Sequence, residues 1–243
     1  MASKQGGDLM YLSRVRVATA GLDAHALGQL MAGHAYGNHQ LLWRLFPEVT
    51  DRPFLFRQEL EHDAGLHGSA RGMPMFYVLS QVEPIPVPGL LECESKPFAP
   101  KLETGQQLAF RLRANPVVAR AEEGRRRSRR HDVLMDAKKA AKEEGITDRL
   151  MVQERMEDAA RAWLGDSERA ARRGYRLPID PQTSGYRQHT FRRKGGEIRF
   201  SSIDFEGRLE VTDPERFLQT LEEGIGRSRA FGCGMWMIRR LES

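Results

Sequence analysis

Tyr36 and His39 are the residues of this sequence whose types and spacing best suit acid and base chemistry. A spacing of three places a phenol and an imidazole side by side on one face of a helix, where either group can reach the same reacting atom. A histidine on a helix also occurs as a hydrogen-bonded structural residue, and for His39 this alternative stays open. For His25 and His34 we adopt the structural interpretation.

A metal site at these histidines is not expected. His34 and His39 are five residues apart and therefore point to different sides of a helix, with no cysteine or carboxylate nearby at ligand spacing. Cys93 and Cys233 are far apart and outside any CxxC pattern. We therefore expect no zinc cluster, no disulfide framework, no cofactor and a reducing, cytoplasmic location.

One helix, predicted over residues 23–47, positions the tyrosine and the histidine. Asp23 suits the N-cap, apolar side chains follow at helical spacing, and Pro47 forbids continuation. Gly33 and Gly37 lie inside this helix, although each glycine costs about 1 kcal/mol relative to alanine. They mark either a local irregularity or a place where another group approaches the backbone.

The composition of the whole chain limits its class. The 243 residues are 40% hydrophobic, which suffices for one large or two small packed domains. The net charge of +5 favours a polyanionic partner. No apolar run approaches the roughly 18 to 20 residues of a membrane span, so we expect no membrane partner. Residues 1–9 are interpreted as a leader or a cloning scar and excluded from the fold prediction.

Strand patterns surround the predicted helix. Residues 11–19 alternate apolar and polar side chains before it, and residues 54–60 and 75–81 are two further strands after it. A strand, helix, strand, strand succession is the first part of a ferredoxin-like fold. Residues 107–113 form another alternating strand, which places Arg111 and Arg113 on the same basic face, and we predict that both bind the polyanionic partner.

A dense arginine run follows in residues 124–132. It has no apolar period and is predicted to be a mobile loop, either a solvated linker or, as we favour, a segment that contacts phosphate. Its arginines are Arg125, Arg126, Arg127, Arg129 and Arg130. Residues 133–174 then have the pattern of charged helices, with Ala162, Trp163 and Leu164 as their packing residues.

The C-terminal third begins with a predicted hairpin over residues 186–207 that turns at Gly195 and Gly196. The tip of this hairpin carries three cations, Arg192, Arg193 and Lys194. A short strand, RLEVTD, comes next. Asp213 and Pro214 then open a helix, with the aspartate at the cap and the proline in the first turn.

A glycine-rich segment, GIGRSRAFGCG, connects this helix to a final strand, MWMIRRL. It follows a helix and opens a strand, whereas the dinucleotide fingerprint follows a strand and opens a helix, so a Rossmann site is excluded. The segment is either backbone lying close to a phosphate chain or a tight connection. Its residues of interest are Gly224, Gly226, Arg227, Arg229, Gly232 and Gly234.

Several segments together resemble the CasE-type CRISPR repeat endoribonucleases of the type I-E Cascade complex, within the RAMP superfamily. The resemblance is carried by MYLSRV, HQLLWRLFP, FRLRANP, AWL and FEGRLEVTDPERFLQTLEEGIGRSRAFGCGM, in this order. It implies an α+β fold of tandem ferredoxin-like (RAMP or RRM-like) domains with antiparallel sheets. We place the N-terminal domain at 10–105 and the C-terminal domain at 106–243.

The resemblance also implies an activity and its residues. The family cuts CRISPR precursor RNA at the base of the repeat hairpin without a metal, and its members stay on the crRNA with the other Cascade subunits. His39 falls on the catalytic histidine and Tyr36 on a tyrosine of the active site. Arg192, Arg193 and Lys194 correspond to basic residues that grip the stem and hold the scissile phosphate.

The implied reaction is attack by the ribose 2′-OH on the adjacent phosphate, which leaves a 2′,3′-cyclic phosphate and a 5′-OH. It needs a proton acceptor, a proton donor and a cation. His39 suits either of the first two roles, and Lys194 or a neighbouring arginine supplies the charge. The alternative is a subunit that binds hairpin RNA without cutting it.

Overall fold

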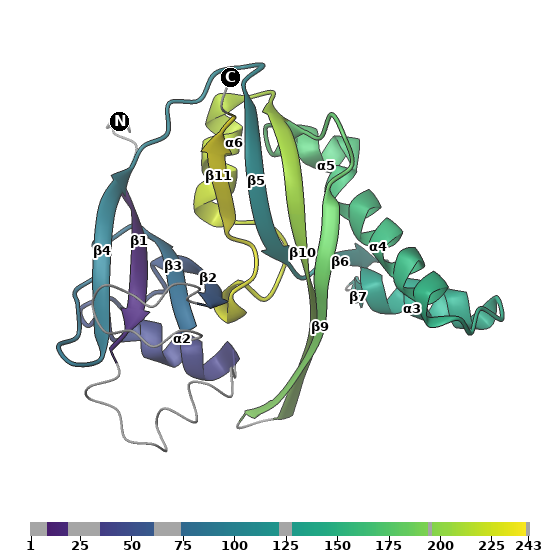
Figure 1. The fold of residues 1–243 in the computed structure, drawn as a ribbon, viewed down its shortest axis with the longest axis horizontal. Coiled ribbons are helices and arrows are strands. Elements are labelled where there is room, and N and C mark those ends of the chain that lie inside the picture. Colours follow the sequence, from purple (N-terminus) through teal and green to yellow (C-terminus); the bar gives the residue numbers. More distant parts are fainter. Residues whose placement is uncertain (1–8, 19–34, 61–73, 122–127, 194–195, 242–243) are drawn as a thin grey trace. The chain divides into compact units, whose positions relative to one another are not determined.

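The chain forms two compact units in the computed structural model, which describes residues 9–18, 35–60, 74–121, 128–193 and 196–241. The first, called unit 1 below, comprises residues 1–101 and 230–232. The second, unit 2, comprises residues 102–229 and 233–243. Each unit has its own antiparallel sheet (Figure 1).

Unit 1 is built on a four-stranded antiparallel sheet in the order β2-β3-β1-β4. Its elements in chain order are β1 (Met10–Val17), α2 (Ala35–Trp43), β2 (Phe54–Leu60), β3 (Pro74–Ser80) and β4 (Leu91–Phe98). This strand order, with β1 between β3 and β4, is that of a ferredoxin-like fold. The prediction of that fold is confirmed for this unit.

The core of unit 1 lies between the sheet and α2. The alternation in β1 turns Val15 and Val17 inward, where they are fully buried. The end of α2 and the turn after it contribute Leu42, Leu45 and Phe46, which join the same apolar cluster. Burial of these side chains provides most of the driving force that fixes the helix on the sheet.

Unit 2 repeats the pattern with a helical insertion. Its sheet runs β11-β5-β10-β8, and β9 also pairs with β10. Its strands are β5 (Gln107–Ala114), β6 (Val117–Arg120), β7 (Arg129–Asp132), β8 (Tyr175–Arg176), β9 (Gln182–Arg193), β10 (Gly196–Val211) and β11 (Trp236–Arg240). Its helices are α3 (Val133–Glu143), α4 (Arg149–Gly165), α5 (Ser167–Arg172) and α6 (Pro214–Glu223). The 3₁₀ turn η1 (Arg229–Phe231) begins at the last residue of the 102–229 segment of unit 2 and continues into residues 230–232 of unit 1.

Helix α6 has the boundaries that its sequence predicts. The side chain of Asp213 accepts a hydrogen bond from the backbone N–H of Arg216, and Pro214 occupies the first turn. At the other end Gly224 has a φ of 71°, a conformation that favours glycine. The helix buries Phe217 against Trp236 of β11, with the ring centroids 6.1 Å apart.

The helix predicted over residues 23–47 is described only in its C-terminal part. Residues 19–34, which include Asp23, His25, Gly33 and His34, lie outside the described residues. Helix α2 ends at Trp43, four residues before Pro47. The turns that follow are held by i→i−3 hydrogen bonds between backbone groups. The N–H of Arg44 donates to the carbonyl oxygen of Leu41 at 3.2 Å, and the N–H of Leu45 donates to that of Leu42 at 3.1 Å.

Two predictions about strands were incomplete. Strand β4 was missed because its polar side chains stay half-exposed or exposed at the sheet edge, so the apolar alternation is weak. The short strand RLEVTD is the end of β10, which continues without interruption from Gly196 to Val211. The two parts were predicted as separate strands because Gly207 interrupts the apolar pattern. In the structure Gly207 lies within the strand and packs closely against Pro181.

The prediction of a mobile loop over residues 124–132 was wrong at its C-terminal end. Residues 129–132 form β7, which pairs with β6. Asp132 accepts hydrogen bonds from the backbone N–H groups of Leu134 and Met135 at the start of α3. Its second oxygen accepts from the backbone N–H and the hydroxyl of Ser201. The pairing with β6 and the contacts with Ser201, which is 69 positions away, overcome the absence of an apolar pattern.

One predicted packing residue in the helices was also wrong. Trp163 and Leu164 are buried, but Ala162 is exposed. The buried positions of α4 begin with Met156 and Ala160, and helical periodicity therefore turns residue 162 away from that stripe.

Replacing Asp132 by alanine is expected to lower the free energy of unfolding by about 2 to 3 kcal/mol, because one cap and the bonds to Ser201 are lost together. Asp148→Ala is the matched control, since Asp148 is exposed and caps only α4. It should cost about 1 kcal/mol. Urea unfolding measures both values, and equal losses would contradict the anchoring role of Asp132.

No helix within the described ranges is long and apolar enough to cross a membrane.

Candidate functional site

His39 lies on α2 and is half-buried. Trp43, one turn later, donates its indole N–H to Nε2 of His39 over 3.2 Å. Phe54 of β2 lies beside both rings, with its centroid 5.9 Å from that of His39 and 5.8 Å from that of Trp43. Phe54 is only 3% exposed and stacks on Phe46. The imidazole therefore packs against a side chain that belongs to the core of unit 1.

A buried amide fixes the rotation of α2. Asn38, which is 2% exposed, donates from its side-chain nitrogen to Oε1 of Gln58 on β2 at 2.7 Å. A buried polar group without a partner is costly, so this bond favours one placement of the helix on the strand. The direction of His39 is therefore set by both a polar and an aromatic contact.

The sequence-based prediction missed Asn38, Trp43 and Phe54 as supports of His39. One signal was present, because Trp43 stands at the i+4 position from His39 and residues four apart are neighbours on a helix. The contact with Phe54 joins two different elements and leaves no such trace in the spacing.

The backbone of Tyr36 is part of α2, and the residue precedes His39 by three positions. Its side chain is not among those described. Lys194 lies outside the described residues altogether. The joint action of Tyr36, His39 and Lys194 therefore stays a prediction.

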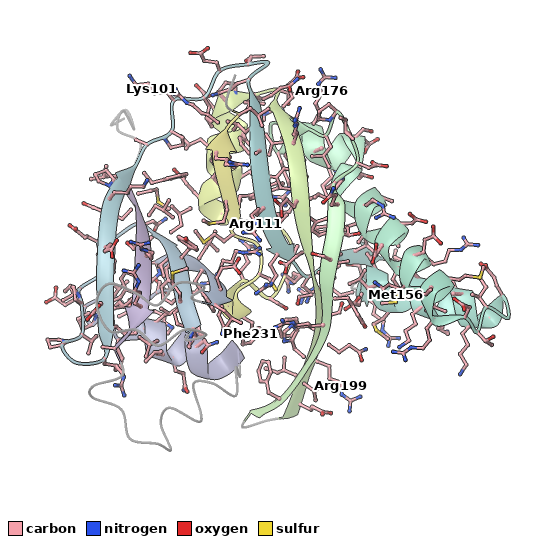
Figure 2. The ribbon with its side chains drawn as sticks, viewed as in Figure 1. Lys101, Arg111, Met156, Arg176, Arg199 and Phe231 are labelled. Carbon is pink, nitrogen blue, oxygen red and sulfur yellow. The ribbon has the colours of Figure 1, made fainter. Side chains whose placement is uncertain are left out.

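Arg111 and Arg113 lie on the same side of β5, as the alternation predicts, but their surroundings differ. Arg113 makes a two-pronged ion pair with Asp204 of β10, at 3.0 Å and 2.8 Å. Arg111, which is labelled in Figure 2, keeps 58% of its side chain exposed. It faces Glu206 at 3.4 Å. A phosphate that binds Arg111 therefore disrupts fewer contacts within the protein than one that binds Arg113.

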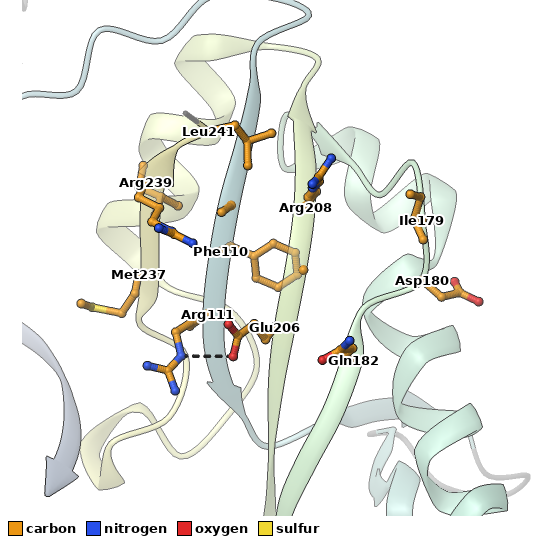
Figure 3. A pocket seen from close by; sticks show the side chains of 13 residues that line it. Phe110, Arg111, Ile179, Asp180, Gln182, Glu206, Arg208, Met237, Arg239 and Leu241 are labelled. Carbon is orange, nitrogen blue, oxygen red and sulfur yellow. Dashed lines mark ion pairs between the residues drawn. The ribbon is translucent and has the colours of Figure 1, made fainter. Parts of the chain in front are cut away.

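Arg111 also lines a pocket of about 920 Å³ on the sheet of unit 2 (Figure 3). Arg208 of β10 and Arg239 of β11 line it too, and both pair in register with Ala109 of β5. Three neighbouring strands thus bring three arginines to one surface. The sequence-based prediction did not single out Arg208 or Arg239, because only the strand order places them beside Arg111.

The remaining predicted basic residues are described unevenly. Arg129 and Arg130 are exposed on β7. Arg192 and Arg193 end β9, where their backbones pair with Glu197 and Gly196 of β10, but their side chains are not described. Nearby, Arg199 of β10 is exposed (Figure 2) and forms an ion pair with Glu197 at 2.7 Å. Arg125, Arg126 and Arg127 of the arginine run lie outside the described residues.

The glycine-rich segment forms a tight connection. Gly226 has a φ of 75°, and a Cβ there would lie 2.9 Å from the carbonyl oxygen of Asn115. Gly234 has a φ of 91°, and a Cβ there would lie 2.6 Å from the carbonyl oxygen of Ile225. Both positions therefore require glycine for conformation and for space. Gly224 and Gly232 also have positive φ values.

The two arginines of this segment contribute to its structure. Arg227 forms a backbone bridge with Asn115. Arg229 donates from its guanidinium to the carbonyl oxygen of Glu223, one of the free carbonyls at the end of α6. The interpretation of this segment as a tight connection is thus supported, while its contact with phosphate stays a prediction.

A second histidine, His189 on β9, has a defined environment in unit 2. Its Nε2 lies 2.8 Å from the hydroxyl of Ser202, and its ring stacks on Phe200 with centroids 4.4 Å apart. Burial, helped by the charges of Arg113 and Arg187, lowers the pKa of His189 below its ordinary value. It is therefore a neutral, packed side chain at pH 7.

Among the residues within the described ranges, no group of three or more histidine, cysteine, aspartate or glutamate side chains is arranged to hold a metal ion.

A family model described as "CRISPR associated protein" matches residues 10–240. The chain is 32% identical to CRISPR-associated endoribonuclease Cse3 of Thermus thermophilus over 219 residues, which cover 83% of this chain and 81% of the relative. It is 28% identical to CRISPR system Cascade subunit CasE of Escherichia coli over 237 residues, covering 96% of this chain and 100% of the relative.

The fold is similar to a solved structure as well. Thermus thermophilus Cse3 bound to an RNA representing a pre-cleavage complex has a TM-score of 0.63 and 27% identity, covering 95% of this chain and 99% of that one. Sequence and fold thus agree over nearly the whole length. The chain belongs to the CasE-type family of CRISPR-associated endoribonucleases.

Proposed function

We propose that this protein cleaves CRISPR precursor RNA at the base of the repeat hairpin, with His39 as a catalytic residue, and then stays on the crRNA as a Cascade subunit. The observation that carries this proposal is the environment of His39. A half-buried imidazole is held by Trp43 and Phe54, and the sequence resemblance implies that His39 corresponds to the catalytic histidine of the family. The relatives named above support the RNA substrate and the assembly.

The proposed step is a transesterification within the RNA. The ribose 2′-oxygen forms a bond to the adjacent phosphorus, and the bond from phosphorus to the 5′-oxygen breaks. The proton of the 2′-OH passes to a base and a proton reaches the leaving 5′-oxygen, so no water is consumed. His39 suits one of these proton transfers, and Tyr36 suits orientation of the 2′-OH or a hydrogen bond to the phosphate.

Cations complete the proposed site. The phosphorane gains negative charge as the 2′-oxygen attacks, and a nearby cation stabilises it. We assign this role to Lys194 or a neighbouring arginine, and assign Arg192 and Arg193 to the RNA stem. Arg111 is exposed enough to bind phosphate beyond the scissile linkage.

Incubation of the protein with a repeat-hairpin RNA in excess EDTA tests this function. We expect undiminished cleavage, with a 2′,3′-cyclic phosphate on the upstream product and a 5′-OH on the downstream product. Mass spectrometry of the products identifies both ends. Loss of cleavage that Mg²⁺ restores would contradict the proposed chemistry, and tight binding without cleavage would favour the hairpin-binding subunit instead.

A further inference from the structure

We propose that Trp43 is a positioning residue that holds the His39 ring in the tautomer with its proton on Nδ1. This proposal rests on the catalytic role proposed for His39. The supporting contact is the hydrogen bond from the indole N–H of Trp43 to Nε2 of His39 at 3.2 Å, made between neighbouring turns of α2.

The chemistry of the indole decides the direction of this bond. A tryptophan N–H is a donor and has no acceptor capacity, so the imidazole nitrogen that faces it must offer a lone pair. In a neutral imidazole with an unprotonated Nε2, the single proton is on Nδ1. The hydrogen bond made by one ring nitrogen thereby sets the state of the other.

The aromatic contacts hold the ring in the position that this bond requires. The rings of His39 and Trp43 are 6.1 Å apart and nearly perpendicular, at 80°. Phe54 contacts the indole edge to face, with 5.8 Å between centroids and 75° between planes. Since Phe54 is buried and stacked on Phe46 at 5.0 Å, the indole has little freedom to turn away.

This arrangement has a consequence for the reaction. Nε2 can take the proton of the 2′-OH, or carry a proton to the 5′-oxygen, only after its bond to Trp43 has been exchanged. Until the RNA provides a new partner, the indole keeps Nε2 unprotonated and keeps the ring from rotating. Trp43 thus prepares the ring without touching the reacting atoms.

Trp43→Phe separates this role from simple packing, because phenylalanine keeps an aromatic ring but has no N–H group. Trp163→Phe is the matched control. Trp163 is buried in unit 2 and also donates one indole hydrogen bond, to the carbonyl oxygen of Val117 at 3.3 Å. Both variants lose one bond of the same kind, but only the first loses a bond to His39.

The first readout is the tautomer itself. It is measured by NMR on the RNA-free protein with ¹⁵N-labelled histidine. The ring-nitrogen signals of His39 are assigned as those that disappear in His39→Ala. The wild type should show a protonated Nδ1 and an unprotonated Nε2 at neutral pH, and Trp163→Phe should match it. Trp43→Phe should shift the signals toward the Nε2–H tautomer. A wild type with its proton on Nε2 would overturn the proposal without any variant.

The second readout is the single-turnover rate at saturating hairpin RNA. Trp43→Phe should be about two- to tenfold slower, the equivalent of one net hydrogen bond, while its RNA affinity stays within about twofold. Trp163→Phe should change neither. A changed tautomer with an unchanged rate would overturn the positioning role. If His39→Ala cuts as fast as the wild type, the catalytic role proposed for His39 fails, and the tautomer measurement still decides whether Trp43 holds the ring.

Discussion

His39→Ala is expected to lower the single-turnover rate of RNA cleavage by about 10²- to 10⁴-fold, the range attributed to one acid or base group. The affinity for the uncut hairpin should stay within a few fold, because shape and phosphate contacts dominate the recognition of RNA hairpins. Cleavage assays and a binding titration on the same RNA measure the two effects separately.

His189→Ala is the matched control for this variant. His189 is also half-buried and also hydrogen-bonded, to Ser202 at 2.8 Å, yet it lies in unit 2 and has no assigned role in the reaction. We expect its cleavage rate to stay near that of the wild type. Equal losses of binding and cleavage in His39→Ala, with a lowered melting temperature, would instead identify His39 as a structural residue.

A single 2′-deoxy nucleotide immediately 5′ of the scissile phosphate is expected to abolish cleavage. The substitution removes the attacking oxygen, and no group of the protein replaces it in the proposed step. Binding should be nearly unchanged, because one hydroxyl contributes at most about one hydrogen bond to a large contact surface. A gel assay with excess protein over many wild-type half-lives measures the residual rate.

The control RNA carries the 2′-deoxy substitution on the nucleotide 3′ of the scissile phosphate, where the hydroxyl is not the nucleophile. This RNA should be cut. Cleavage of the first RNA would show that water attacks the phosphate, and the products would then carry a terminal phosphate without a cyclic intermediate. That outcome contradicts attack by the 2′-OH but leaves the assignment of the family intact.

The sequence predicts a chemistry for the candidate site but not the contacts that support its residues. The types and spacing of Tyr36 and His39 identify acid and base groups on one helix, and the resemblance to a known family names the reaction. The pairing of Arg113 with Asp204 was not predictable, because the two residues are 91 positions apart in the sequence. That pair occupies one of the two guanidinium groups that were predicted to bind a polyanionic partner.

Sequence alone determined the elements whose cause is local. Helix α6 begins at Asp213 and Pro214 and ends at Gly224 because capping and proline geometry act within a few residues. The apolar alternation likewise predicted β1 and β5, since a strand buried on one face must repeat every two residues.

Tertiary structure alone decided the elements whose stability comes from distant partners. β4 has a weak apolar pattern and is held as a strand by its ladder with β1. β7 interrupts an arginine run because it pairs with β6 and because Asp132 binds Ser201. The orientation of His39 on α2 has the same kind of cause, since its ring contacts Phe54 of strand β2. A local sequence pattern reflects the conformational preferences of neighbouring residues. The strand pairings and side-chain contacts described above form only when folding brings residues that are distant in sequence together.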